Sequence, residues 1–480
     1  MNSNKKFKFL LFLAMVIFIA TKAAHLDIPY FWDESWVYAP AVLTMAEMGP
    51  SLAPNALPVE LSRGHPLLFH FLGGVWLNIF GTSIASCHSF ALLISSFFLL
   101  SFYWVLEKVF DARIAFVSTL LVAFQSIFYA QSSLLLPETL LTAASFLAVS
   151  FFVLDRFLLY VLFGSIAVLT KESGVVVPIT TVIVYLLIQA RVGPGFSLTK
   201  LFKKTAIALV PLVVFLLFML IQFFQKGWFL YPDHVALTSL HFTNIIDKGQ
   251  EILDWIIRFQ GRGLFFTSTL AICFGHLLFR KRFVSMRFDQ LQKSFLYYHG
   301  GFLLLFFLFC ATNHLTLRYL LPLIPPLTFL LTWSIFYFSE GRPKIRYSLF
   351  VVILINLLCY TITLKDSDLG DTSLSYLNFS PLQKEVVQYL EDQVIYDQPI
   401  YTGFLLSYAL ECDKCGFRES NRSFTKLNQW DANYAEYYQI FSNIELNSEN
   451  YQVFRDSPNA ELVKRFEKEQ FWFEIYLMKR

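Results

Sequence analysis

Long hydrophobic runs alternate with short polar segments along the first 364 residues. Several runs approach the roughly 20 residues that an α-helix needs to cross a bilayer. The pattern therefore predicts an all-α polytopic bundle of about eleven transmembrane helices. The predicted spans cover residues 9–27, 84–106, 114–131, 139–154, 157–170, 174–190, 205–224, 263–279, 294–312, 319–338 and 347–364.

The composition agrees with this pattern. Hydrophobic residues make up 56% of the chain and charged residues 15%, whereas soluble domains carry about 25% charged residues. We therefore expect an integral, multi-pass membrane protein. The first apolar run lacks a small-residue cleavage site, so it is interpreted as a retained span and not as a signal peptide.

Lysine and arginine are unevenly distributed between the two sets of loops. The N-terminal end and the loops on its side hold eighteen of these residues, and the opposite loops hold seven. Because basic residues near span ends are retained in the cytoplasm, the N-terminus is predicted inside and the C-terminus outside. The apolar run 65–80 is predicted to be interfacial or re-entrant, because counting it as a span would export the basic cluster 280–282.

The composition changes after residue 364. Acidic residues outnumber basic ones and the apolar runs become shorter. We expect a transmembrane domain at 1–364, with a first outer loop and juxtamembrane helices at 29–83, and a small soluble α/β domain at 365–480. In the latter the pattern predicts a helix at 382–390 and strands at 400–401 and 471–477.

The C-terminal segment offers little chemistry of its own. Its net negative charge argues against nucleic acid or anionic lipid as a partner. Cys412 and Cys415 are predicted to be a structural disulfide or free thiols in preference to a metal or redox centre. The chain has no Walker loop, no GxGxxG opening a helix and no HExxH, so nucleotide-driven chemistry is unsupported.

Polar groups collect at the predicted outer ends of the spans. Ionised side chains are costly near hydrocarbon and tend to serve chemistry or a partner there. Carboxylates and cations at one interface suit the transfer of a group carried on a phosphate, because a carboxylate can deprotonate the incoming hydroxyl while cations stabilise the departing phosphate. The group comprises Asp33, Glu34, Arg63, His65, Glu138, Lys171, Glu172, Asn313, His314, Arg318 and Tyr319.

Each of these residues also has a purely structural explanation. Asp33 could belong to a solvated acidic cap, and Glu138 follows a proline at a helix start, where an acid complements the helix dipole. Lys171 could simply pair with Glu172 at a span end. Arg318 could snorkel from the next span. The constellation is therefore more informative than any one member.

The order of the motifs resembles that of the GT-C glycosyltransferases. Trp-Asp-Glu-Ser-Trp-Val-Tyr follows the first span, a basic residue precedes Pro-Leu, and Pro-Glu follows the third span. Leu-Thr-Lys precedes a glycine-containing span, and Arg-Tyr-Leu-Leu-Pro-Leu-Ile-Pro-Pro opens a late one. The likeness covers roughly residues 1–340. It is to the branch that contains the bacterial aminoarabinose transferase of lipid A and the dolichyl-phosphate-mannose-protein mannosyltransferases, and it implies the GT-C fold.

The resemblance also implies roles for the carboxylates. Asp33 corresponds to the base or acceptor-orienting carboxylate, Glu34 assists it or holds a cation, and Glu138 is the second acid of the site. A divalent cation, Mg²⁺ or Mn²⁺, could bridge these three carboxylates to the phosphate, since hard oxygen ligands suit both ions. Metal dependence is left open.

The basic residues are assigned to the donor phosphate by the same resemblance. The chain departs from the aminoarabinose branch at Arg63-Gly-His65-Pro66, where those relatives usually carry Lys-Pro-Pro. Phosphate binding there falls to Arg63 or to a protonated His65. Glu172 replaces the common glycine after Lys171, which leaves the donor contacts at that point open. The full phosphate-binding set is Arg63, His65, Lys171, Arg318 and Tyr319.

The implied function is an inverting glycosyltransferase that moves a sugar from a polyprenyl-phosphate donor to an acceptor hydroxyl on lipid A, a surface glycan or a protein. An outward-facing site agrees with this, because nucleotide sugars are made in the cytoplasm and an outer site needs a sugar already carried across on lipid. We expect the bacterial inner (plasma) membrane, with the active site and C-terminus outside. The expected partners are the donor lipid, the acceptor and the membrane, without nucleic acid.

Two alternatives remain at this point. A transporter or flippase of lipid-linked sugars would favour polar residues that continue through the bundle to both faces, whereas here they crowd one face. A catalytically silent scaffold would not need carboxylates at Asp33 and Glu138. The sugar, the acceptor and the oligomeric state are not determined by the sequence.

Overall fold

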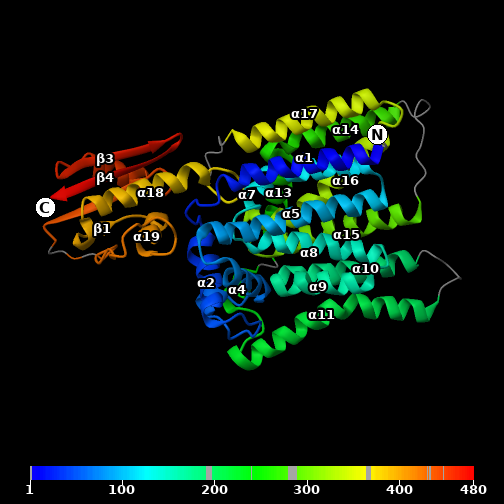
Figure 1. Ribbon diagram of the computed structural model, residues 1–480, viewed down its shortest axis with the longest axis horizontal. Helices are drawn as coiled ribbons and strands as arrows, with labels where there is room; N and C mark the ends of the chain where they lie inside the picture. The colour runs from blue at the N-terminus through cyan, green and yellow to red at the C-terminus, as the bar shows by residue number, and fades with distance from the viewer. Residues whose placement is uncertain are drawn as a thin grey trace.

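A helical bundle and a small sheet make up the fold (Figure 1). The computed structural model describes residues 3–190, 197–238, 241–278, 289–363, 369–429, 431, 434–446 and 448–479. Within these residues, six helices are long and apolar enough to cross a membrane. The predicted multi-span helical protein with a small C-terminal sheet is thereby confirmed, while the count of eleven spans stays a prediction.

Each predicted apolar run coincides with one helix or with consecutive helices. Four shorter apolar helices, including α4, α8 and α9, accompany the six long ones. The helices at the predicted spans are α1 (Ser3–Ala23), α5 (Ile84–Val109), α6 (Ala112–Ala123) with α7 (Ser126–Gln131), α8 (Pro137–Val153), α9 (Phe157–Thr170), η2 (Glu172–Val175) with α10 (Val176–Ala190), α11 (Leu198–Lys226), α14 (Arg262–Leu278), α15 (Gln290–Thr312), η5 (Leu317–Leu323) with α16 (Ile324–Phe338), and α17 (Pro343–Ile362).

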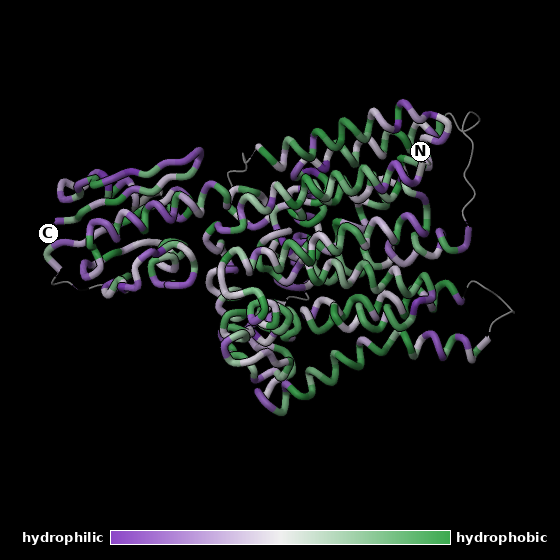
Figure 2. Tube along the Cα trace, in the orientation of Figure 1, coloured by the Kyte–Doolittle hydropathy of each residue, from purple (hydrophilic) through white to green (hydrophobic). Residues whose placement is uncertain are grey.

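The outer helices of the bundle expose apolar side chains. Helix α11 leaves Leu216, Leu217 and Phe224 largely exposed, and α17 does the same with Val351 and Ile355. Figure 2 shows these helices as predominantly hydrophobic along their length. A water-exposed surface of this kind would be unfavourable, so these faces are suited to lipid.

The first outer loop forms short helices at one end of the bundle, next to the C-terminal segment (Figure 1). They are η1 (Glu34–Tyr38), a π-helix, then α2 (Ala39–Met48), α3 (Val59–Ser62) and α4 (Leu68–Phe80). Helix α4 has 13 residues and is therefore about 20 Å long, well short of the hydrocarbon thickness of about 30 Å. This length agrees with the predicted interfacial or re-entrant position.

The C-terminal segment contains the elements that the sequence predicts. The strand order is β1-β2-β4-β3, with β1 parallel to β2 and the other pairs antiparallel. The predicted helix and both predicted strands are present. The elements are α18 (Tyr376–Asp392), β1 (Ile400–Tyr401), α19 (Phe404–Glu411), β2 (Glu436–Ser442), α20 (Ser448–Arg455), β3 (Ala460–Lys468) and β4 (Phe471–Lys479).

The C-terminal segment packs directly on the first outer loop. The ring of Phe31 stacks on that of Tyr376 at 5.7 Å, and one apolar cluster continues from the outer loop into the sheet. The two parts therefore share a core. The predicted boundary at 364/365 and the basic residues 191, 280–282 and 287, which support the predicted orientation, lie outside the described residues, so the boundary and the orientation remain predictions.

Candidate active site

A cavity of about 430 Å³ lies where the outer-loop helices meet the ends of the membrane helices. Apolar side chains from α8, α11 and α15, including Leu141, Phe215 and Phe306, form part of its wall. The other part is polar. Seven of the eight predicted site residues line it, namely Asp33, Arg63, His65, Glu138, Lys171, Arg318 and Tyr319.

Arg318, in the 3₁₀ helix η5 that opens the late span, is the centre of an ion-pair cluster. Its guanidinium is paired with Asp33 and lies 2.7 Å from Asp371 Oδ2, while its Nε lies 3.5 Å from Glu138 Oε1. Arg318 itself is almost fully buried. A buried charge is tolerated when it is paired and hydrogen-bonded. Asp33 and Asp371 accept hydrogen bonds from the two terminal nitrogens of Arg318, whereas its buried Nε has no hydrogen-bond partner among the described residues.

Lys171 completes the cluster from the end of α9. Its Nζ donates to Glu138 Oε1 at 2.8 Å and lies 3.5 Å from the centre of the Tyr319 ring. Burial is the largest single influence and opposes the charged form, but the Glu138 carboxylate and Tyr319 together outweigh it and raise the pKa of Lys171 above its ordinary value. The ammonium therefore stays charged at neutral pH. We call Asp33, Glu138, Asp371, Arg318 and Lys171 the carboxylate–cation cluster.

The cluster holds more negative than positive charge when its carboxylates are ionised, with three carboxylates against two cations. Both cations already have carboxylate partners. One oxygen, Glu138 Oε2, is buried without a hydrogen-bond partner among the described residues. An arriving phosphate would therefore have to exchange with a carboxylate at Arg318 or Lys171, or meet additional positive charge elsewhere in the cavity.

The backbone before the cavity places Asp33. Trp32 adopts a left-handed conformation with φ 51°, which is costly for a non-glycine residue, and η1 begins directly after Asp33. The amide of Tyr30 donates to the carbonyl of Cys415 at 3.0 Å. The C-terminal segment therefore helps to hold the segment that carries Asp33.

Glu34 points away from the cavity. Its buried carboxylate accepts hydrogen bonds from the amides of Phe31, at 3.1 Å, and of Leu135, and lies 3.2 Å from His88 Nε2. With its oxygens used in this way, Glu34 ties the outer loop to α5 and to the turn before α8. This geometry gives no support to the predicted catalytic or cation-holding role of Glu34.

Arg63 provides the cavity with a cation outside the ion-pair cluster. Its guanidinium lies 4.2 Å from the centre of the Trp36 ring, an arrangement typical of a cation–π contact. Its Nε is buried without a hydrogen-bond partner among the described residues. Arg63 can therefore offer hydrogen-bond donors to an anion in the cavity.

His65 lies beside Glu172 and His234 in the same cavity. His65 Nδ1 is 2.8 Å from Glu172 Oε2, and the rings of His65 and His234 are 4.8 Å apart. One potential ligand atom from each of the three residues lies within 4.8 Å of the others. We call these residues the histidine cluster. They could hold a metal ion, whereas the predicted metal set of Asp33, Glu34 and Glu138 forms no such group in the described part of the chain.

The ring of His234 is kept neutral by its surroundings. Burial, together with the neighbouring His65, lowers the pKa of His234 to about 4. His234 lies in α12 (Pro232–Ala236), a short helix that follows α11. Gly64, with φ +71°, allows this segment to approach, because a Cβ on Gly64 would meet Tyr231 Cβ at 2.6 Å.

Two residues of the site escaped the sequence reasoning. Asp371 lies in the C-terminal segment among several aspartates, and no periodicity distinguishes it. His234 lies in a largely apolar stretch between two predicted spans and belongs to no recognisable motif. Only the proximity of Asp371 to Arg318 and of His234 to His65 identifies them, and both contacts join segments far apart in sequence.

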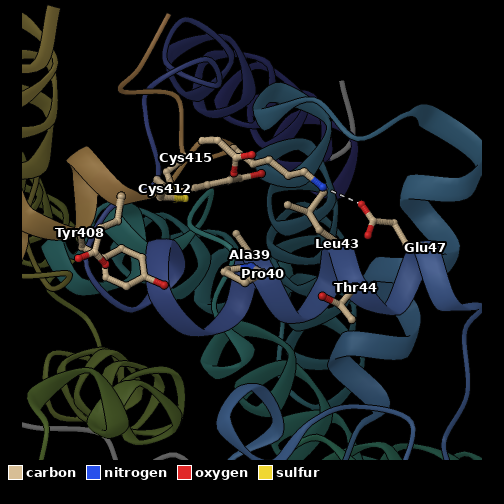
Figure 3. A pocket seen from close by; sticks show the side chains of 12 residues that line it. Ala39, Pro40, Leu43, Thr44, Glu47, Tyr408, Cys412 and Cys415 are labelled. Atoms are coloured by element: carbon tan, nitrogen blue, oxygen red, sulfur yellow. Dashed lines mark hydrogen bonds and ion pairs between the residues drawn. A yellow bond between two sulfur atoms is a disulfide. The ribbon is translucent and has the colours of Figure 1, made fainter. Parts of the chain in front are cut away.

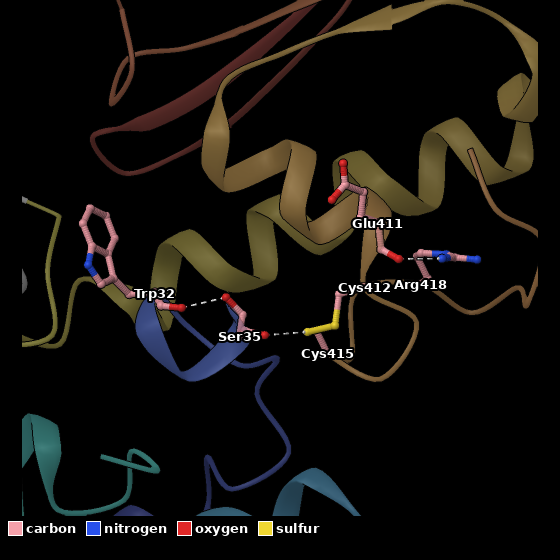
Figure 4. Close-up of a disulfide and its surroundings, with 6 residues drawn as sticks. All are labelled: Trp32, Ser35, Glu411, Cys412, Cys415 and Arg418. Atoms are coloured by element: carbon pink, nitrogen blue, oxygen red, sulfur yellow. Dashed lines mark hydrogen bonds between the residues drawn. A yellow bond between two sulfur atoms is a disulfide. The ribbon is translucent and has the colours of Figure 1, made fainter. Parts of the chain in front are cut away.

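A second cavity, of about 430 Å³, lies between α2 and the end of α19 (Figure 3). Lys414 Nζ is 2.8 Å from Glu47 Oε1 across it. Cys412 and Cys415 form a disulfide beside it (Figure 4), which is one of the two alternatives, disulfide or free thiols, that the sequence left open. Cys415 Sγ lies 3.5 Å from the carbonyl oxygen of Ser35, so the disulfide turn rests on the π-helix that follows Asp33.

Comparisons with known proteins agree with this architecture. Residues 64–221 match the family described as dolichyl-phosphate-mannose-protein mannosyltransferase. The fold is similar to that of ArnT from Cupriavidus metallidurans bound to undecaprenyl phosphate, with a TM-score of 0.53, 13% identity and 97% of each chain covered. The apo state of the same protein gives a TM-score of 0.53 and 15% identity, over 96% of this chain and 97% of that one. No curated protein matches the sequence.

The family match and the shared fold confirm the resemblance drawn from the sequence motifs. The chain is similar to polyprenyl-phosphate-sugar-dependent glycosyltransferases of the GT-C class. The matched segment contains four residues of the two clusters that line the cavity and that the sequence identified: His65, Glu138, Lys171 and Glu172.

Proposed function

We propose that this chain is a polyprenyl-phosphate-sugar-dependent glycosyltransferase of the GT-C class, and that it transfers a sugar from such a donor to an acceptor hydroxyl, with inversion, at the cavity described above. The single observation that carries the proposal is the carboxylate–cation cluster. It brings Asp33, Glu138, Lys171 and Arg318 together at the end of an apolar bundle. The apolar wall from α8, α11 and α15 suits the polyprenyl chain of the donor.

In this proposal Asp33 is the general base. Its carboxylate is paired with Arg318. When the donor phosphate binds, Arg318 exchanges part of this pairing for phosphate oxygens, because a guanidinium binds phosphate in a two-pronged geometry. Asp33 is then free to accept the proton of the acceptor hydroxyl as that oxygen attacks the anomeric carbon.

The cations stabilise the leaving group. As the bond between the anomeric carbon and the phosphate oxygen breaks, negative charge grows on the phosphate, and Lys171 and Arg318 lie where they can neutralise it. Tyr319 holds the Lys171 ammonium over its ring. Glu138 keeps both cations oriented toward the cavity. One displacement on the side opposite the phosphate accounts for inversion.

The acceptor is a lipid A, a surface glycan or a protein hydroxyl in this proposal, and the site faces outward from a bacterial inner membrane. The test is sugar transfer by the purified protein in nanodiscs. Radiolabelled polyprenyl-phosphate sugars and a panel of envelope acceptors are supplied to the wild type and to Asp33→Asn. Transfer by the wild type and its collapse in a folded Asp33→Asn protein support the proposal.

A different result would contradict it. If a labelled donor binds and changes leaflet while no acceptor becomes labelled, the protein moves lipid-linked sugars without transferring them. If Asp33→Asn retains wild-type transfer, another group is the base.

A further inference from the structure

The histidine cluster has the ligand chemistry of a transition-metal site. Two imidazoles and one carboxylate suit Zn²⁺, whereas Mg²⁺ prefers oxygen ligands alone. Zinc binds nitrogen and oxygen at about 2.0–2.2 Å, which places neighbouring ligand atoms of a tetrahedral site about 3.4 Å apart. The potential ligand atoms of His65, Glu172 and His234 already lie within 4.8 Å of one another.

The cluster is open on one side. His65, Glu172 and His234 all line the cavity, and the side chains of His65 and Glu172 are 11% and 20% exposed. Zinc sites that bind an exchangeable ligand have three protein ligands and a fourth position open to solvent. A structural zinc site would use a fourth protein ligand instead.

The charge of the cavity supports a cation at this end. In the carboxylate–cation cluster, Arg318 and Lys171 face three carboxylates, so these five residues bring no surplus positive charge to a phosphate. Among the described residues that line the cavity, the remaining lysine or arginine is Arg63. A divalent ion at the histidine cluster would add positive charge to the same cavity.

We propose that His65, Glu172 and His234 bind Zn²⁺, with the fourth coordination position directed into the cavity to take an oxygen of the donor phosphate. The phosphate part of this inference rests on the proposed function, while the metal part does not. The ion would also join α12 to the turn before α4 and to η2, because His234 lies on α12 and the other two ligands lie on those segments.

Metal binding is tested first without any donor. The full-length protein in nanodiscs is stripped with EDTA and titrated with Zn²⁺ by calorimetry, and with Co²⁺ by its visible absorption. We expect one Zn²⁺ per chain and a tetrahedral Co²⁺ spectrum for the wild type. His234→Ala and Glu172→Gln should each weaken Zn²⁺ binding by about tenfold or more.

The matched control is His241→Ala, which removes an exposed histidine from the same outer loop and should bind Zn²⁺ like the wild type. Size-exclusion profiles and thermal unfolding establish that each variant is folded, and two ligand variants guard against one of them failing to fold. Absence of Zn²⁺ binding by the wild type, or unchanged binding by both ligand variants, overturns the proposal.

The second arm measures the affinity for undecaprenyl phosphate with and without Zn²⁺. We expect removal of Zn²⁺ to weaken binding by about tenfold in the wild type and to have little effect in His234→Ala. Equal affinities in the wild type would overturn the phosphate role while leaving the metal site. Zinc binding with no transfer from any donor would count against the proposed function alone, so the two failures are distinguishable.

Discussion

The two polar clusters of the cavity satisfy their charges in different ways. The carboxylate–cation cluster is buried, and its cations already lie against carboxylates. The histidine cluster is partly exposed and contains one close pair, His65 with Glu172, plus the neighbouring ring of His234. The first is suited to holding groups in fixed positions for proton and phosphate chemistry. The second leaves coordination positions free, which is the property of a binding site.

The two clusters also differ in the structural elements that hold their side chains. Glu138 and Arg318 are placed by the starts of helices in the bundle, and Asp33 by the start of the π-helix η1 in the outer loop. His234 is placed by a short helix in a loop. Rigid elements hold catalytic groups more accurately than loops do, so we expect substitutions in the first cluster to affect the chemical step and those in the second to affect binding.

The largest expected effect is that of Asp33→Asn. Loss of the base should lower kcat by about 10²–10⁴-fold in a protein that still folds, because Arg318 keeps Asp371 and Glu138 as partners. Asp371→Asn is the matched control, since Asp371 also binds Arg318 but does not line the cavity. Its kcat should fall by less than about tenfold. Steady-state kinetics of both variants measure this difference in kcat. Equal losses of kcat would show that Asp33 acts only through Arg318.

Lys171→Met should have the next largest effect. A hydrogen bond to a charged group contributes about 1.5–3 kcal/mol, so removal of this cation should weaken donor binding or transfer by about 10–100-fold. Lys171→Arg keeps the charge and should recover part of the loss. Donor affinity and kcat/KM measured for both variants would decide the point. Full activity of Lys171→Met would remove Lys171 from the phosphate site.

Glu34→Gln should behave as a positioning change. The substitution weakens buried hydrogen bonds to the amides of Phe31 and Leu135, with an expected cost of about 1–3 kcal/mol in the free energy of unfolding. Transfer should fall only several-fold, through kcat, because Asp33 is less well placed. Glu47→Gln, at an exposed residue, is the control. A loss of kcat as large as that of Asp33→Asn would instead place Glu34 in the reaction.

The smallest expected effect is that of removing the disulfide. A disulfide that closes a four-residue loop stabilises by about 2 kcal/mol at most in the chain-entropy treatment. Cys412→Ser with Cys415→Ser should therefore lower the unfolding temperature slightly and reduce transfer by less than about threefold. Thermal unfolding and transfer assays measure both. A large loss of kcat without a change in stability would show that the disulfide turn controls Asp33.

The sequence by itself determined the helices of the bundle and most of the site. Apolar runs become helices in a membrane because the backbone has to satisfy its hydrogen bonds internally, and this requirement is local. Asp33, Glu138, Lys171 and Arg318 could be found because they stand at the ends of such runs, where a charge is unusual. The short helix 382–390 and the strands at 400–401 and 471–477 were likewise visible as local patterns.

The tertiary structure alone decided which polar groups meet. Asp33 and Glu34 are adjacent in sequence but contact different groups. The Glu34 carboxylate, in the π-helix, meets the amides of Phe31 and Leu135 and the ring of His88, whereas Asp33 pairs with Arg318. Asp371 joins the site because the C-terminal segment packs against the outer loop, and His234 joins because its loop packs on Gly64. These contacts depend on how distant segments pack together, and the local pattern of hydrophobic and polar residues does not specify that packing.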